Sequence, residues 1–230
     1  MAKNKPVIGI TMAPDKGFTL QFFMLQLSVF IAGGKPAKLK VYDEEKARKI
    51  DGLLIGGGRD VYPAMYQQEA IPGNPYNRVQ DDMESKWLYW AMKNNLPVMA
   101  ICRGAQLMNV IKGGTIHHNL TAIFENADYP HSIWSYNFFR KKIQITADSL
   151  LYKITGKDEI YVNSIHKRAI DKPGTGLQVT SREPNGIIQS IEDPSHRFFM
   201  GMQFHPERLI YLKKFRKIFR FFVKTAGKEF

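Results

Sequence analysis

The hydrophobic residues in the first half of the chain form short apolar runs separated by amphipathic stretches. The apolar runs have the length of strands and cover 6–11, 36–41, 52–55 and 97–101. The amphipathic stretches have helical spacing and cover 19–32, 43–50, 81–94 and 103–111. Strands that alternate with helices are typical of a parallel sheet covered by helices, so the pattern predicts an α/β fold.

After residue 127 the pattern changes to short β-rich pieces. The strand candidates, separated by Pro, Gly, Asn or Asp, cover 143–147, 160–163, 176–180, 187–192 and 198–204. We expect them to complete the sheet with mixed or antiparallel strands. No linker-like stretch or repeat divides the chain, which predicts one domain over residues 1–230.

The last predicted helix covers about 208–225 and is amphipathic. Its apolar side carries Tyr211, Leu212, Phe215, Ile218, Phe219, Phe222 and Val223, and its basic side carries Lys213, Arg216, Lys217, Arg220 and Lys224. The pattern favours a helix that packs its aromatic side on the sheet and leaves its basic side in water. The alternative is contact with an anionic membrane surface, which basic amphipathic helices also bind.

Composition and charge narrow the class of protein. The formal net charge of the 230 residues is +12, but eight Lys or Arg residues and no acid lie between Arg208 and Lys228, so the excess is largely local and we expect no nucleic-acid partner. A single cysteine excludes an internal disulfide and suits a reducing compartment. The N-terminal apolar run is too short for a signal peptide, and no stretch is long enough for a membrane span. We therefore expect a cytoplasmic protein.

The single cysteine, Cys102, stands where the predicted strand 97–101 meets the predicted helix 103–111. Small residues on both sides, Ala100 and Gly104, suit a sharp turn that exposes a nucleophile above the carboxyl edge of a sheet. The start of a helix also favours the thiolate, the reactive form of a thiol. The alternative interpretation is a small buried hydrophobic residue, the usual role of a lone cysteine.

Three consecutive glycines, Gly56, Gly57 and Gly58, follow the strand candidate 52–55. Such a turn lets the backbone approach a ligand and point its N–H groups at it. A phosphate loop is one candidate, but the Gly-Lys-Ser/Thr ending and the GxGxxG spacing are both missing. An oxyanion site made of backbone N–H groups is the other. Both would lie at the same sheet edge as Cys102.

A cysteine nucleophile requires a base, and six histidines compete for that role: residues 117, 118, 131, 166, 196 and 205. His205 follows the strand candidate 198–204, and Pro206 fixes a turn that lets Glu207 reach its ring. A surface turn is the alternative. The adjacent pair His117 and His118 lacks metal-binding spacing and accompanying carboxylates, so we predict no metal site.

Four motifs in order carry a resemblance to a known family. They are GGGRDV at 56–61, AICRGAQLMNV with Gly113, Gly114 and Thr115, VNSIH at 162–166, and GMQFHPE at 201–207. Together they resemble the class I glutamine amidotransferase superfamily. More narrowly they are similar to its γ-glutamyl hydrolase branch, the peptidase C26 group that includes γ-glutamyl-γ-aminobutyrate hydrolase. The resemblance implies a flavodoxin-like three-layer α/β/α sandwich, a Cys-His-Glu triad, and no metal or organic cofactor.

Matching positions assign roles by resemblance. Cys102 would be the nucleophile, His205 the base and Glu207 its orienting acid. The backbone N–H groups of Arg103 and of Gly57 or Gly58 would form the oxyanion hole. Substrate contacts are expected from Gln106, Asn163, Ser164, His166, Lys167 and Arg168. The implied activity is hydrolysis of a small γ-glutamyl amide to glutamate and an amine through a cysteine thioester.

The sequence departs from the family pattern near the expected substrate. Ala100 replaces a common glycine, Gln80 replaces the arginine of an Arg-Asp element, and Lys167 and Arg168 replace a His and a Gln. If Lys167 and Arg168 face the site, the amine half of the substrate would be anionic. The alternative is that both side chains point to solvent.

Two other functions remain open. A glutaminase subunit that delivers ammonia to a separate synthetase would use the same triad, although the absence of a fused synthase domain favours the hydrolase. A non-enzymatic binding or regulatory protein would use the basic terminal helix as its interaction surface, but it has no chemical need for Cys102, His205 and Glu207 together. Either a homodimer or a synthetase complex is compatible with the sequence.

Overall fold

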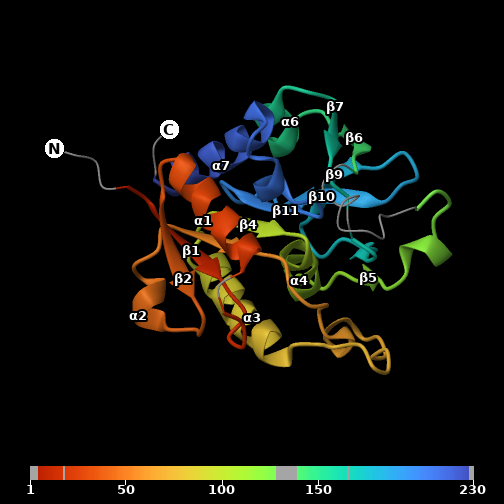
Figure 1. Cartoon of the computed structure of the whole chain (residues 1–230), viewed down its shortest axis with the longest axis horizontal. Helices are drawn as coiled ribbons and strands as arrows, with labels where there is room; N and C mark the ends of the chain where they lie inside the picture. Colours follow the sequence, from red (N-terminus) through yellow and green to blue (C-terminus); the bar gives the residue numbers. More distant parts are fainter. Residues whose placement is uncertain (1–4, 18, 128–138, 165, 228–230) are drawn as a thin grey trace.

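A nine-stranded mixed sheet forms the centre of the computed structural model, which describes residues 5–17, 19–127, 139–164 and 166–227 (Figure 1). Across the sheet the order is β2-β1-β3-β4-β11-β10-β9-β6-β7. In that order the strands are Lys35–Leu39, Val7–Thr11, Gly52–Ile55, Val98–Ile101, Phe199–Met202, Ile188–Glu192, Gln178–Arg182, Lys141–Ile145 and Glu159–Val162.

The sheet divides into a parallel half and an antiparallel half. Strands β2, β1, β3, β4 and β11 are parallel neighbours, whereas β10, β9, β6 and β7 add by antiparallel pairing. The predicted α/β fold with antiparallel strands from the second half of the chain is confirmed. Parallel neighbours end at the same edge, so the turns after β3, β4 and β11 meet there.

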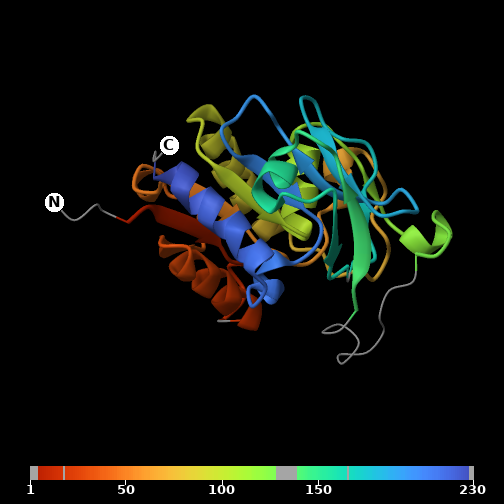
Figure 2. The same ribbon diagram turned by 90° about the horizontal axis from the view of Figure 1, so that it is seen from above.

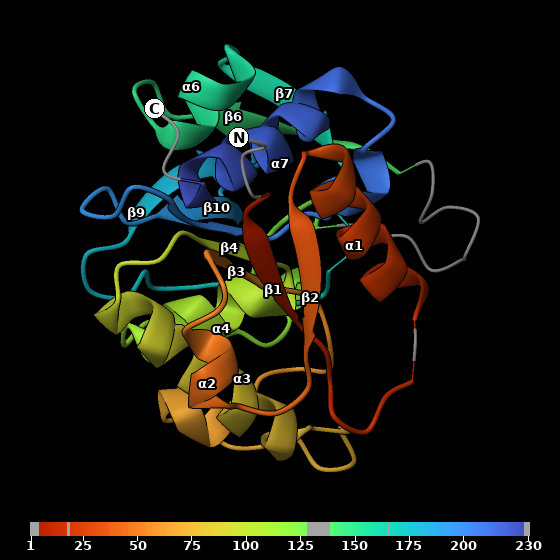
Figure 3. The same cartoon turned by 90° about the vertical axis from the view of Figure 1, so that its left-hand side faces the viewer.

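Helices cover both faces of the sheet. Helices α1 (Leu20–Ile31) and α7 (Lys213–Ala226) lie side by side on one face (Figures 2 and 3), and α6 (Leu150–Thr155) packs beside α7. Helices α3 (Arg78–Lys93) and α4 (Arg103–Ile111) cover the other face with the short α2 (Glu44–Ala47). This arrangement is the three-layer sandwich that the resemblance implied.

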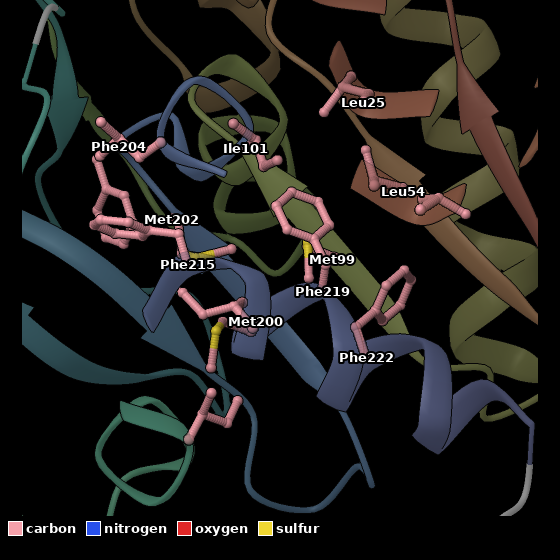
Figure 4. Close-up of a cluster of buried hydrophobic side chains, with 14 of the residues drawn as sticks. Leu25, Leu54, Met99, Ile101, Met200, Met202, Phe204, Phe215, Phe219 and Phe222 are labelled. Atoms are coloured by element: carbon pink, nitrogen blue, oxygen red, sulfur yellow. The ribbon is translucent and has the colours of Figure 1, made fainter. Parts of the chain in front are cut away.

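Alternation along the central strands divides the core into two layers. In β3 and β4, Leu54 and Met99 belong to the cluster under α1 and α7, whereas Leu53 and Val98 belong to the cluster under α3 and α4. Three aromatic residues one helical turn apart fill the first cluster from α7 (Figure 4): Phe215, Phe219 and Phe222. The aromatic side of the terminal helix is therefore buried in the core.

Several elements differ from the sequence prediction. Strands β5 (Ile116–His117) and β8 (Ala169–Ile170) form a separate antiparallel pair, and α6 was not predicted. The terminal helix begins at Lys213 rather than 208, because a 3₁₀ turn at Pro206–Leu209 precedes it. Elements this short carry too few residues to show a period, and their partners lie far away in the chain. Among the described residues, none of the helices combines the length and apolar character needed to cross a membrane.

We predict that Gly104→Ala destabilises the protein. A Cβ at Gly104 would lie 2.5 Å from the carbonyl oxygen of Ile55 and 3.0 Å from that of Gly56, and backbone atoms cannot move aside as side chains do. The expected loss in free energy of unfolding is about 1–3 kcal/mol, measured by urea denaturation.

The matched control is Gly17→Ala. No heavy atom lies within 4 Å of a Cβ at Gly17, so its effect should stay within about 0.5 kcal/mol. Equal stability of the two variants would contradict the proposed packing constraint.

Candidate active site

Cys102 occupies a strained turn between β4 and α4. Its backbone has φ 53° and ψ −111°, a region that residues with side chains seldom adopt. The N–H of Cys102 donates to the carbonyl of Met202 at 2.7 Å, which holds the turn against the end of β11. The half-buried thiol therefore lies at the positive end of α4, above the carboxyl edge of the parallel strands.

His205 lies just beyond β11, the strand next to β4. Its Nδ1 is 2.7 Å from Oε1 of Glu207, and both side chains are buried. The side-chain amide of Asn163 holds the backbone of His205 through two hydrogen bonds of 3.0 Å, one accepted from the His205 N–H and one donated to its carbonyl. Asn163, which we expected to contact substrate, is thus engaged with the histidine backbone.

The charge state of His205 reflects the side chains of Glu207 and Cys102 beside it. Burial lowers the pKa of His205, but the charges of Glu207 and Cys102, with hydrogen bonds to both, raise that pKa to about 10. The imidazolium is therefore the favoured form, positioned between a thiol and a fully buried carboxylate. This is the arrangement required to hold a cysteine as thiolate and to donate a proton later.

Gln203 is a further neighbour of the thiol that we did not single out from the sequence. Its Nε2 lies 3.7 Å from Sγ of Cys102, and its Oε1 accepts from Nε2 of Gln106 at 3.1 Å. The same Gln106 nitrogen lies 3.1 Å from the carbonyl oxygen of Arg168. A glutamine at the buried end of an apolar strand, three residues after Met200, was the only signal in the sequence.

The glycine turn after β3 is packed on both sides. A Cβ at Gly57 would lie 2.6 Å from Nε2 of Gln21, and one at Gly58 would lie 2.9 Å from Nε2 of Gln80. A side chain at either position would require the neighbouring glutamine amide to move. A cavity of about 170 Å³ borders the turn on the side of α1.

A buried charge cluster lies between the glycine turn and the cysteine turn. The guanidinium of Arg103 forms ion pairs with Asp81 and Glu84, and all three side chains are almost completely buried. Glu84 also accepts from Oγ1 of Thr11 at 2.9 Å and from Nε2 of Gln80 at 3.0 Å. The cluster thereby connects β1, α3 and α4 beneath the two turns.

His166 and Ser164 belong to a second buried network. Nε2 of His166 lies 2.9 Å from Nε2 of Gln189 and 3.1 Å from Oγ of Ser164, which itself donates to Glu183 at 2.8 Å. Burial lowers the pKa of His166 to about 3, and the nearby charge of His205 adds to that effect. The ring is therefore neutral at physiological pH.

The two unexpected cations behave differently from each other. Arg168 is partly buried and forms an ion pair with Asp60, two residues beyond the glycine turn, whereas Lys167 is exposed. Arg168 therefore connects the segment of His166 to the turn after β3, and its charge already has a partner.

The other histidines lie away from this cluster. His117 is 3.2 Å from Asp171, His196 is 3.3 Å from Asp193, and His118 lies 3.5 Å from the hydroxyl of Tyr66. His131 lies outside the described residues. Within the described part of the chain, no group of three or more His, Cys, Asp or Glu side chains is arranged to hold a metal ion.

Comparison with known proteins gives matches over most of the chain. The family model described as Peptidase C26 matches residues 6–207. The chain is 33% identical to protein NtpR of Enterococcus hirae, with 76% of each chain covered. It is 27% identical to the γ-glutamyl-γ-aminobutyrate hydrolase PuuD of Escherichia coli, with 89% of this chain and 86% of that protein covered.

A structural match extends the comparison at lower sequence similarity. The crystal structure of a provisionally identified GMP synthase subunit from Thermoplasma acidophilum superimposes with a TM-score of 0.70 at 16% identity. The match covers 98% of this chain and 96% of that one. Identity this low establishes a shared fold and nothing narrower.

We predict that Glu207→Gln changes stability in a pH-dependent way. The folded-state pKa of His205, about 10, lies above its ordinary value of 6.5. The protonated ring therefore stabilises the fold fully below pH 6.5, and this contribution is lost as pH rises towards 10. Removing the Glu207 charge should lower that pKa, so wild type and variant should differ most near pH 6.5 and converge towards pH 10.

Urea denaturation at pH 6.5, 8 and 10 measures this difference, and the NMR titration of the His205 ring measures the pKa directly. His166 provides an internal control, because its ring should remain neutral throughout that range. A constant difference in unfolding free energy, together with an unchanged His205 titration, would contradict the assignment.

Proposed function

The chain belongs to the peptidase C26 family, and we propose that it hydrolyses a small γ-glutamyl amide through a thioester on Cys102. The family and its named relatives support γ-glutamyl amide hydrolysis or a glutamine amidotransferase-type activity. The observation that carries the assignment of Cys102 as nucleophile is the His205 ring, which pairs with buried Glu207 at 2.7 Å and lies beside a thiol on a strained turn.

The first step is attack by the Cys102 thiolate on the γ-carbonyl carbon. The carbonyl π electrons move to oxygen, and a tetrahedral intermediate forms. The start of α4 and the His205 imidazolium favour the thiolate before attack. Gln203, whose amide lies 3.7 Å from the sulfur, helps to orient it.

The negative oxygen is stabilised by backbone N–H groups. We assign the donors to Arg103, at the start of α4, and to Gly57 or Gly58. Donors that are fixed before reaction cost no reorganisation, and one such donor contributes about 3 kcal/mol to catalysis. The packing of Gln21 and Gln80 on the glycine turn and the buried pairing of Arg103 support a rigid hole.

Collapse of the intermediate releases the amine. His205 transfers its proton to the departing nitrogen as the C–N bond breaks, leaving a thioester and a neutral ring. The Cys102 charge, one cause of the raised His205 pKa, has by then been consumed, so the ring gives up its proton more readily. The neutral ring then removes a proton from water, which attacks the thioester and releases glutamate.

The positions of Lys167 and Arg168 indicate which of them could recognise a charged group on the substrate. Arg168 is already paired with Asp60. This pairing favours a structural role, in which Arg168 links two segments, over recognition of an anionic substrate. Lys167 is exposed and remains available to a carboxylate or phosphate on the amine half of the substrate. We therefore propose Lys167 as a substrate contact and assign Asn163 and Arg168 to positioning. The buried Gln106 amide is engaged with Gln203 and the Arg168 carbonyl, so it also acts in positioning.

A glutaminase subunit for a separate synthetase is the second candidate function. The same triad would release ammonia from glutamine, and the fold shared with a GMP synthase subunit is compatible with such a role. In that case glutamine hydrolysis should appear only when a partner is added. We expect either function to take place in the cytoplasm.

We predict that Cys102→Ser abolishes both labelling and turnover. A glutamine-like electrophile should add to wild type with one equivalent of mass, whereas the variant should stay unmodified. Glutamate release from a γ-glutamyl anilide should fall by at least roughly 10³-fold. Intact mass spectrometry and a glutamate assay measure the two outcomes, and a fully active Cys102→Ser variant would refute the mechanism.

We predict that Lys167→Ala selectively weakens the use of anionic substrates. An exposed ion pair contributes up to about 1 kcal/mol, so KM for a carboxylate-bearing γ-glutamyl amide should rise about fivefold, with little change for a neutral amide. Lys172→Ala is the matched control, since Lys172 is an exposed lysine of the same segment. Equal KM changes for both substrates would exclude this role of Lys167.

A further inference from the structure

Helix α1 exposes an apolar stripe on the face of the molecule remote from α3 and α4. Leu20, Phe23 and Phe30 are 75%, 45% and 63% exposed, and Ile31 is also exposed. The spacing of residues 20, 23, 27, 30 and 31 puts them along one side of the helix. Large apolar side chains in a row on a surface indicate a contact site, because scattered ones are the norm elsewhere.

A cationic stripe of the same length lies on the neighbouring helix α7. Lys213, Lys217, Arg220 and Lys224 are exposed at successive turns, and α1 and α7 lie side by side on this face (Figures 2 and 3). The first and last residues of each stripe are eleven positions apart, which corresponds to about 16 Å along the helix axis. Apolar and basic residues thus run beside each other along the same face of the protein.

The α7 segment carries many positive charges and no acid of its own. No acidic residue occurs between Arg208 and Gly227. In the part of the chain that the structure describes, neither Lys217 nor Arg220 forms an ion pair. Burial and the nearby charges of Lys157 and Arg140 lower the pKa of Lys214. The surface therefore favours an anionic partner.

The lysine content of the α7 stripe favours a lipid surface over a protein as the anionic partner. Protein interfaces are enriched in arginine and depleted in lysine, whereas three of the four exposed stripe cations are lysines. Lys5, which lies 5.7 Å from the Phe30 ring, adds another cation beside the apolar stripe. Basic side chains beside Leu and Phe side chains are the composition of surfaces that lie on anionic headgroups.

We propose that the α1–α7 face binds anionic membrane surfaces reversibly. Leu20, Phe23 and Phe30 would enter the boundary between headgroups and acyl chains, and the α7 cations would contact lipid phosphates. The proposal is independent of the catalytic assignment, since none of these residues belongs to the site around Cys102.

Sedimentation with liposomes tests this surface. Wild type should pellet with vesicles of phosphatidylcholine and phosphatidylglycerol at low ionic strength, less so at high salt, and not with phosphatidylcholine alone. Lys217→Gln/Lys224→Gln should reduce partitioning roughly thirtyfold, at about 1 kcal/mol per charge. Leu20→Ser/Phe30→Ser should reduce it about tenfold.

The matched control is Lys86→Gln/Lys93→Gln on α3, which removes two charges with the same spacing on the opposite face. This variant should keep wild-type partitioning within about twofold, and thermal melts should show that all variants are folded. If Leu20→Ser/Phe30→Ser does not fold, the comparison of Lys217→Gln/Lys224→Gln with Lys86→Gln/Lys93→Gln decides the test.

Three results would overturn the proposal. Wild type could fail to pellet with anionic vesicles at low salt. The α3 control could lose as much binding as the α7 variant, which would indicate an effect of net charge alone. Light scattering could show a dimer that Leu20→Ser/Phe30→Ser dissociates, in which case a second copy of the chain covers the face.

Discussion

The buried ion cluster of Arg103, Asp81 and Glu84 is the interaction on which the candidate site depends. It brings together α4, which begins next to Cys102, α3 on the same face, and β1 through Thr11. Burying a guanidinium and two carboxylates is costly, and removing one partner would leave an uncompensated charge in the core. The cluster therefore favours the relative position of α3 and α4 that keeps all three charges paired. Because Arg103 adjoins both the cysteine turn and the glycine turn, the cluster helps to fix the position of both turns.

Parallel strand order places the catalytic candidates at one edge. Cys102 follows β4 and His205 follows β11, its parallel neighbour, so residues far apart in the chain become adjacent without a dedicated loop. The antiparallel half of the sheet contributes Asn163, which follows β7 and holds the His205 backbone. The mixed sheet thus places the two candidate residues after its parallel strands and their supporting amide after an antiparallel strand.

The carboxyl edge of the sheet and the α1–α7 face differ in the kind of side chains they carry. At the carboxyl edge, buried charges and hydrogen bonds fix a few polar groups in place, which suits chemistry that needs preorganised donors. On the α1–α7 face, apolar side chains of α1 and cationic side chains of α7 are exposed to water. Helix α1 belongs to both, since Gln21 packs on Gly57 while Leu20 and Phe23 face outward.

The sequence predicted the alternation of strands and helices in the first half of the chain, the short strands of the second half, and Cys102, His205 and Glu207 as candidate site residues, because periodicity and local motifs are properties of neighbouring residues. It did not reveal Gln203 beside the thiol, the pairing of Arg168 with Asp60, or the partners of Arg103. Those contacts join residues distant in the chain, and no local pattern encodes them. Only the tertiary structure decided them, because the free energy of burying a charge depends on which groups the folded chain brings to it.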